Sequence, residues 1–148
     1  MIALLKPSDV PVLKALLRVF GDAFGDVATY QHEVPPDEYL RSLLGLPHLI
    51  ALAALDDAGS VVGGLVAYEL QKFERDRREI YIYDLAVANA HRRKGIATAL
   101  IRDLQRVAKE RDAYVIFVQA DPGDAPAIAL YESLGTREDV HHFDIRVD

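Results

Sequence analysis

The sequence predicts one α/β domain built on a mixed, mostly antiparallel sheet that is flanked by about four helices. The chain has 148 residues, which is the size of a single domain. Its composition, with 51% hydrophobic and 27% charged residues, is typical of a globular protein. Apolar runs with strand composition alternate with segments whose apolar residues recur every three or four positions. No repeat, low-complexity segment or long linker divides residues 1–148, so we expect one domain.

The N-terminal third is expected to hold one short strand and two helices. Residues 2–6 are apolar and predict the strand. Ser8 or Asp9 would cap a helix with Pro11 in its first turn, and Gly21 and Gly25 would then break it. An irregular loop would cover residues 22–34, followed by a second helix over 35–44.

The rest of the chain predicts three successive strands and then an alternation of helices and strands. The three strands are residues 48–55, 61–70 and 79–87, which suit antiparallel pairing. A helix that opens at Gly95 and a strand at 113–120 suit a parallel crossover. A short helix at 125–134, stopped by Gly135, and a final strand at 140–147 complete the prediction.

Composition excludes several function classes. The net charge of −6 argues against nucleic-acid binding and is compatible with a cationic partner. No cysteine is present, which excludes disulfides, thiolate metal sites and a cysteine nucleophile. The five histidines do not form a metal-ligand pattern, so we expect no metal. No apolar run is long enough to cross a bilayer and no export signal is recognisable, so we expect a cytoplasmic protein.

Residues 79–108 carry the strongest functional signal. A buried-looking strand is followed by three consecutive cations, Arg92, Arg93 and Lys94, and then by a helix start at Gly95. Unpaired N–H groups and the helix dipole at such a junction attract anions, and glycine allows a phosphate to approach the main chain. The glycine patterns of nucleoside-triphosphate and dinucleotide loops are absent. We therefore interpret this stretch as a cradle for a different diphosphate.

Two motifs resemble those of the GCN5-related N-acetyltransferase superfamily. Arg92-x-x-Gly95-x-Ala97, preceded by Asp84-Leu-Ala-Val, is similar to its acetyl-coenzyme A motif, [RQ]-x-x-G-x-[GA]. The segment from Asp124 to Gly135 resembles the ending N-x-x-A-x-x-x-Y-x-x-x-G, with Asp124 where the family usually has Asn. The resemblance implies central strands that splay apart, with the pantetheine arm of acetyl-coenzyme A in the gap.

Longer blocks resemble the aminoglycoside 3-N-acetyltransferases of this superfamily. They lie at residues 24–30, 49–54, 79–87, 91–101, 113–121 and 142–145. This resemblance implies transfer of acetyl from acetyl-coenzyme A to the 3-amino group of a 2-deoxystreptamine aminoglycoside such as gentamicin, with antibiotic resistance as the result. It also implies a polycationic small-molecule substrate and a homodimer.

The resemblance also implies roles for individual residues. Asp84 would be the base that accepts the proton of the amine, directly or through water, and Tyr131 the acid for the leaving thiolate. Glu79 is a weaker candidate, on the opposite face of a regular strand. The coenzyme would be bound by Leu85, Ala86, Val87, Arg92, Arg93, Lys94, Gly95, Ile96, Ala97, Thr98, Asp124 and Tyr131.

The acceptor site should be acidic and aromatic, because aminoglycosides carry several ammonium groups. Its candidates are Tyr30, Tyr83, Asp84, Asp121, Asp144 and Asp26 or Glu33. Structural alternatives stay open: Asp84 as a paired strand-end carboxylate, Tyr131 as a packing residue and the loop carboxylates as solvated groups. The alternative functions are acetylation of a polyamine or another small amine, and a non-catalytic sensor that binds acetyl-coenzyme A.

Overall fold

The computed structural model describes residues 1–148 and contains a five-stranded sheet in the order β1-β2-β3-β4-β5. The strands are β1 (Ile2–Leu4), β2 (Leu49–Leu55), β3 (Val61–Gln71), β4 (Arg78–Val87) and β5 (Ala113–Val118). Strands β1 to β4 pair antiparallel, and β5 is parallel to β4. The mixed, mostly antiparallel sheet predicted from the sequence is therefore confirmed.

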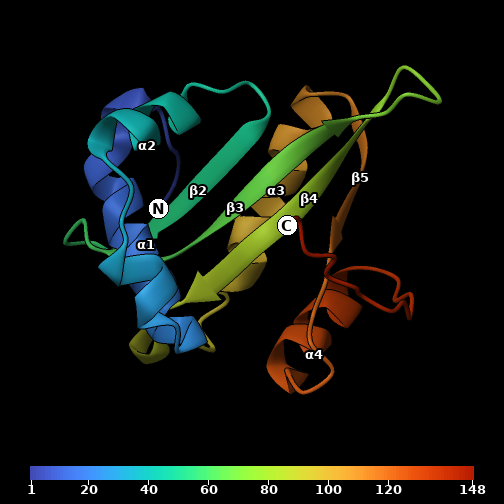
Figure 1. Cartoon of the computed structure of the whole chain (residues 1–148). Coiled ribbons are helices and arrows are strands. Elements are labelled where there is room, and N and C mark those ends of the chain that lie inside the picture. Colours follow the sequence, from blue (N-terminus) through green and yellow to red (C-terminus); the bar gives the residue numbers. More distant parts are fainter.

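Four helices flank the sheet, as predicted. They are α1 (Val10–Phe24), α2 (Asp37–Leu44), α3 (Ile96–Glu110) and α4 (Ala125–Leu134). Short helical turns lie at η1 (Pro7–Asp9), η2 (Ala28–His32) and η3 (Asn89–His91). Figure 1 shows α1 and α2 together at one side, α3 behind the sheet and α4 beyond the end of β5.

Both faces of the sheet are buried over β2 and β3. Ile50 and Leu52 belong to the apolar cluster on the α3 side, whereas Ala51 and Ala53 belong to the cluster on the α1 side. A strand that is buried on both faces has apolar residues at nearly every position, which explains the composition of residues 49–55. Gly64 allows α1 to lie close, because a Cβ there would be 2.5 Å from Leu16 Cδ1.

The central strands separate near the end of the sheet. The pairing of β4 with β5 ends at Ile82 opposite Val118, although β4 continues to Val87. Residues 84–87 therefore pair with β3 on one side, and residues 83–87 have no strand neighbour on the other. This is the splayed arrangement that the family resemblance implied.

A β-bulge at Tyr83 shifts the alternation of side chains along β4 by one residue, so that the side chains after it point to the opposite faces. Val66 lies opposite Asp84 and Ala67 opposite Ile82, so that Tyr83 has no partner. Before the bulge, Ile80 and Ile82 pack on the α3 side, whereas after it Asp84 reaches the α1 side. The prediction that Glu79 and Asp84 occupy opposite faces is therefore wrong, because it assumed a regular strand.

Two other predictions are also wrong. Gly21 does not break the first helix, because it is buried inside α1 against Gln31, whereas Gly25, the other glycine predicted to break it, ends the helix in a left-handed conformation (φ 64°). Residues 140–147 form no strand, because the chain after Gly135 makes no backbone hydrogen bond and is exposed throughout. Alternation of apolar and polar residues favours a strand only where a neighbouring strand supplies the hydrogen bonds.

Each helix of the structure is too short or too polar to span a membrane.

Candidate active site

The loop between β4 and α3 has a conformation that gathers its main-chain N–H groups. Arg93 and Gly95 both adopt left-handed backbone conformations, with φ of 61° and 79°. Such turns point successive N–H groups toward one place and form a concave site for anions. A Cβ on Gly95 would meet no atom within 4 Å, so the space beside it is open.

The N–H groups of this loop are available to a ligand. The six consecutive residues Arg93–Thr98 donate no backbone hydrogen bond to any protein acceptor, and the first such bond of α3 runs from Ala99 N to Gly95 O. Added to these donors are the dipole of a 15-residue helix and the exposed cations Arg93 and Lys94. The arrangement fits a diphosphate, which the sequence predicted for this loop.

Arg92 connects the loop to β4. Its Nε donates to the carbonyl of Val87 at 3.3 Å, so this side chain fixes the turn in addition to supplying charge. Next to it, the edge of β4 that faces away from β3 is open from Tyr83 to Val87. Main-chain groups on an unpaired strand edge are able to bind an extended, amide-containing chain as another strand would.

Asp84 lies beside this open edge. Its Oδ2 accepts a hydrogen bond from the Tyr30 hydroxyl at 3.0 Å, and the side chain is half-buried. Burial raises the pKa of Asp84 above its ordinary value, while the hydrogen bond from Tyr30 acts in the opposite direction. A carboxylate with a raised pKa is a better proton acceptor for an amine than an exposed one.

Tyr30 reaches Asp84 because η2 folds back over α1. Its ring packs against Phe20 and Phe24, with centroids 6.0 and 5.5 Å away, and Asp26 Oδ1 accepts a hydrogen bond from Thr29 N at 3.1 Å. Burial raises the pKa of Tyr30, and the charge of Asp84 raises it further. The hydroxyl therefore stays protonated and acts as a donor to Asp84.

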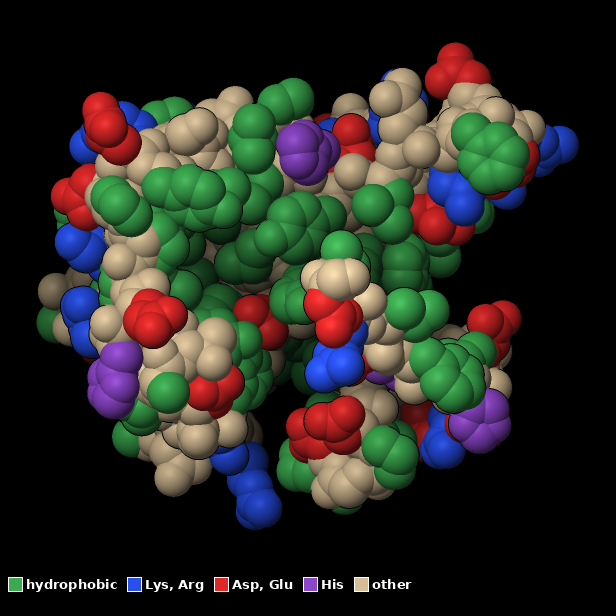
Figure 2. Space-filling model, viewed as in Figure 1, with side chains coloured by type: hydrophobic (Ala, Val, Ile, Leu, Met, Phe, Trp, Pro, Cys, Tyr) green, Lys and Arg blue, Asp and Glu red, His purple; other side chains and the backbone are tan.

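Aromatic side chains form a wall next to Asp84. Tyr83 contacts Tyr68 and Tyr81 edge to face, with centroids 6.0 and 5.8 Å apart, and Tyr81 stacks on Phe117 at 4.6 Å. Of these side chains, only Tyr83 was predicted from the sequence, whereas Tyr68, Tyr81 and Phe117 were not. Tyr81 and Tyr83 alternate along one strand, a signal that was available in the sequence. Figure 2 shows the hollow in front of β3 and β4, lined mainly by hydrophobic side chains with acidic ones among them.

Tyr131 lies on α4, half-buried against the cluster on the α3 side. Burial, followed by the charge of Asp124, raises the pKa of Tyr131 to about 12. Asp124 itself caps α4, because its Oδ1 accepts a hydrogen bond from Ala127 N at 3.2 Å. The side chain of Asp124 therefore stabilises the first turn of α4.

Three of the remaining acidic candidates have no side-chain contact with Asp84. Glu33, Asp121 and Asp144 are exposed, and their carboxylates make no hydrogen bond or ion pair with the other predicted site residues. Asp144 pairs with His142 at 2.9 Å in the C-terminal segment. Asp26 is closer, since its charge contributes to the raised pKa of Tyr30.

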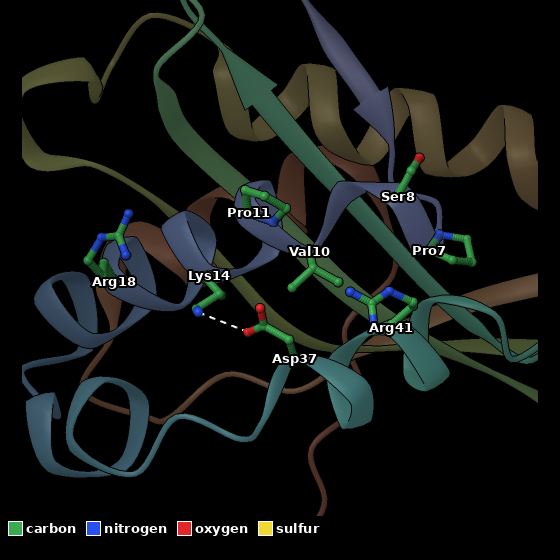
Figure 3. Close-up of a pocket in the computed structure, with 8 residues that line it drawn as sticks. All are labelled: Pro7, Ser8, Val10, Pro11, Lys14, Arg18, Asp37 and Arg41. Carbon is green, nitrogen blue, oxygen red and sulfur yellow. Dashed lines mark hydrogen bonds and ion pairs between the residues drawn. The ribbon is translucent and has the colours of Figure 1, made fainter.

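A separate pocket of about 510 Å³ lies between α1 and α2, away from β4 and α3 (Figure 3). Figure 3 shows Lys14 paired with Asp37, at 2.9 Å, with Arg18 and Arg41 on either side. A pocket with these cations does not suit a polycationic acceptor. No group of His, Cys, Asp or Glu side chains is arranged to hold a metal ion.

Comparison with known proteins gives the family. The model of the acetyltransferase (GNAT) family matches residues 13–136. An L-methionine sulfoximine/L-methionine sulfone acetyltransferase of Pseudomonas paraeruginosa is 27% identical over 142 residues, which cover 91% of this chain and 80% of the relative. The N-acetyltransferase family 8 member 2 of Rattus norvegicus is 27% identical over 88 residues, 60% of this chain and 39% of that protein.

Two solved structures are also similar. An aminoglycoside acetyltransferase from an uncultured soil metagenomic sample has 56% sequence identity and a TM-score of 0.98, over 100% of this chain and 98% of that chain. A second aminoglycoside acetyltransferase from such a sample, in complex with sisomicin, has 31% identity and a TM-score of 0.92, over 100% and 96%. The anion cradle, the splayed strands and these matches lead to one conclusion: the chain belongs to the acetyltransferase (GNAT) family, whose enzymes use acetyl-coenzyme A.

Proposed function

We propose that this acetyltransferase moves acetyl from acetyl-coenzyme A to the 3-amino group of a 2-deoxystreptamine aminoglycoside such as gentamicin. In a cell the enzyme would act in the cytoplasm as a homodimer and give resistance to the drug. The observation that carries the proposal is the hydrogen-bonded, half-buried Asp84 between an aromatic wall and the open edge of β4. The similarity over the whole chain to aminoglycoside acetyltransferases supports the choice of acceptor.

The coenzyme is proposed to enter the gap between β4 and β5. N–H groups of Arg93–Thr98 would bind its diphosphate, with charge from Arg92, Arg93 and Lys94. Main-chain groups of Leu85, Ala86 and Val87 would bind the pantetheine amides and orient the thioester carbonyl. Asp124 would support the coenzyme site only by stabilising the start of α4, because its carboxylate already caps that helix.

The acceptor is proposed to bind in front of Asp84 and Tyr83. The carboxylate attracts an ammonium group, and the rings of Tyr68, Tyr81 and Tyr83 provide flat faces for sugars and cations. Asp26 and Glu33 on the first loop, Asp121 after β5 and Asp144 in the tail would contribute charge to bound polycations.

The chemistry requires two protons to leave the ammonium nitrogen, one before and one after it attacks, and one proton to reach the thiolate. Asp84, directly or through water, would accept a proton from the bound ammonium, which frees the nitrogen lone pair to attack the thioester carbonyl. The carbon–nitrogen bond forms, the nitrogen releases its second proton to solvent, and the carbon–sulfur bond then breaks. Tyr131, with a pKa of about 12, would donate its proton to the departing thiolate and regain one from solvent.

A thiol-release assay with gentamicin, kanamycin, apramycin and spermidine tests the proposal. We expect turnover of gentamicin, with NMR of the product placing the acetyl group on the 3-amino nitrogen. Turnover of spermidine alone would show that the protein is an acetyltransferase whose acceptor is a polyamine and not an aminoglycoside. Binding of acetyl-coenzyme A without any turnover would favour the sensor.

A further inference from the structure

The short turn η2, which carries Tyr30, is tied to α1 by the side chain of Gln31. Nε2 of Gln31 donates two hydrogen bonds, to the carbonyl oxygen of Arg18 at 3.0 Å and to Oδ1 of Asp22 at 2.8 Å. Both partners are acceptors, so only a donor at this position satisfies them together. No other side chain of η2 forms a hydrogen bond with α1, so the polar attachment of the turn depends on this one amide.

Gly21 makes room for this amide inside α1. A Cβ at Gly21 would lie 2.6 Å from Nε2 of Gln31 and 3.0 Å from its Cγ, which is closer than real Cβ contacts allow. Glycine inside a helix is less stable than alanine, so its presence in α1 points to a need for space. Even alanine at this position would displace an amide that two hydrogen bonds hold in place. Gly21 and Gln31 therefore belong to one contact between α1 and η2.

This contact lies one residue from Tyr30, whose hydroxyl donates to Asp84 at 3.0 Å. The ring of Tyr30 packs on Phe20 and Phe24 of the same helix, but packed rings tolerate small rotations and shifts. A hydrogen bond, in contrast, requires a defined distance and direction. The amide of Gln31 supplies this directional attachment of η2, so its position determines where the Tyr30 hydroxyl lies relative to the carboxylate.

Other ionisable side chains lie near the contact between Tyr30 and Asp84. They are Asp26 before η2, Tyr68 of β3, and Tyr81 and Tyr83 of β4. Burial raises the pKa of Tyr68 and Tyr81, so both stay neutral in the acid range. The hydroxyl of Tyr30 is the only side-chain group that forms a hydrogen bond with the carboxylate of Asp84. A variant in which Tyr30 lacks its hydroxyl therefore separates this contact from all the others.

We propose that Gln31 is a positioning residue, whose amide, seated on Gly21, holds η2 so that the Tyr30 hydroxyl donates to Asp84. This role of Gln31 rests on the proposed function, in which Asp84 is the base for the acceptor amine. The hydrogen bond from Tyr30 lowers the pKa of Asp84, so its loss raises that pKa. Loss of the amide should therefore give the enzyme the pH dependence of Tyr30→Phe, although the Tyr30 hydroxyl is still present.

Two variants remove the amide contact from opposite sides. Gln31→Met keeps the length of the side chain without its donor, and Gly21→Ala fills the space that the amide occupies. In both, we expect the acidic limb of log(kcat/KM) to move to higher pH, as in Tyr30→Phe, and the double variant Tyr30→Phe/Gln31→Met to show no shift beyond that of Tyr30→Phe. Two matched controls should keep the wild-type profile. They are Gln71→Met, at an exposed glutamine of β3, and Gly45→Ala, where a Cβ would be in ordinary contact at 3.5 Å.

An NMR titration measures the contact without any turnover. The carboxylate carbon of Asp84, identified by the absence of its signal from Asp84→Asn, reports the pKa of this group in the protein alone. We expect that pKa to be higher in Gln31→Met and Gly21→Ala than in the wild type and the two controls. Far-UV circular dichroism checks the fold, and Gly21→Ala, which adds a better helix former to α1, supplies the test if Gln31→Met does not fold.

An Asp84 pKa in these variants equal to that of the wild type overturns the proposal. A further shift in the double variant overturns it too, because Gln31 would then act on Asp84 by a route other than Tyr30. A raised pKa of Asp84 without a change in the pH profile supports Gln31 as the positioning residue and refutes Asp84 as the base. The failure of this proposal and the failure of the proposed function are therefore distinguishable.

Discussion

A single long-range hydrogen bond opposes the effect of burial on the pKa of Asp84. Tyr30 belongs to a loop that is 54 residues from Asp84 in sequence, and their contact depends on the packing of η2 against α1. The sequence named both residues for the site, Asp84 from its place next to the motif and Tyr30 as a flat surface. Their contact could not be predicted, because it depends on how a π-helical turn folds over a neighbouring helix.

Removing the Tyr30 hydroxyl should shift the acidic limb of the pH profile. The hydrogen bond lowers the pKa of Asp84, so in Tyr30→Phe that pKa rises and the basic form is lost at a higher pH as the solution is acidified. We expect log(kcat/KM) to fall at higher pH than in the wild type and to approach the wild-type value at alkaline pH. Tyr39→Phe, at an exposed tyrosine of α2, is the control and should leave the profile unchanged.

Tyr131→Phe should lower kcat while the KM for acetyl-coenzyme A stays nearly constant. Loss of a proton donor in the transition state costs about 10²–10⁴-fold in rate. Because burial raises the pKa of Tyr131 to about 12, the wild type should also lose no activity through ionisation of this residue up to roughly pH 10. Initial rates from pH 6 to 10 measure both effects, and an unchanged kcat would show that Tyr131 only packs on α4.

At the scale of elements, the pattern of apolar residues predicted the helices and strands, whereas the site depends on a break in the regular pairing of β4. Strands β2 to β5 and all four helices were predicted near their observed limits. Helices α1, α2 and α3 each bury a face with a clear apolar period, and β2 is a continuous apolar run buried on both faces. The bulge at Tyr83 was not predicted, since a bulge changes the alternation by one residue within an apolar run that looks continuous. That bulge brings Asp84 to the same side of the sheet as Tyr30.

Gly95→Ala should weaken coenzyme binding in addition to stability. An alanine in the left-handed conformation costs about 1–2 kcal/mol, and its methyl group would occupy the open side of the cradle. Gly59→Ala is a matched control, because Gly59 has a φ of 84° and equally open surroundings in the turn between β2 and β3. Thermal melts should fall similarly for both variants, whereas only Gly95→Ala should raise the KM for acetyl-coenzyme A.

At the scale of the whole molecule, the sequence predicted one sheet with splayed strands and missed how its last segment behaves. Residues 140–147 have the alternation of a strand, yet no strand of their own chain pairs with them. Periodicity indicates which side chains would gain from burial, but it does not indicate whether a neighbouring strand is present to pair with them. A single sequence therefore predicts the strands inside the sheet better than the course of a segment outside it.

The free energy of unfolding should be lowered by the charge of Asp84, the proposed base. The pKa of Asp84 is raised in the folded protein, so its charged form destabilises the fold at neutral pH, and this cost disappears as the pH falls through the folded-state pKa. Asp84→Asn keeps an acceptor for Tyr30 and removes the charge. We expect a higher Tm than the wild type at pH 7, a difference that shrinks on acidification, and a rate at least about 10²-fold lower.

Thermal melts across the acid range measure this trade-off, with Asp57→Asn in the exposed turn after β2 as the control that should show no such trend. A lower Tm for Asp84→Asn at pH 7 would mean that Asp84 supports the fold through its charge. In that case the carboxylate would be a structural partner of Tyr30, and its role as the base would fail together with this prediction. A higher Tm with lost activity would instead mark a group that the protein retains, against its own stability, for the reaction.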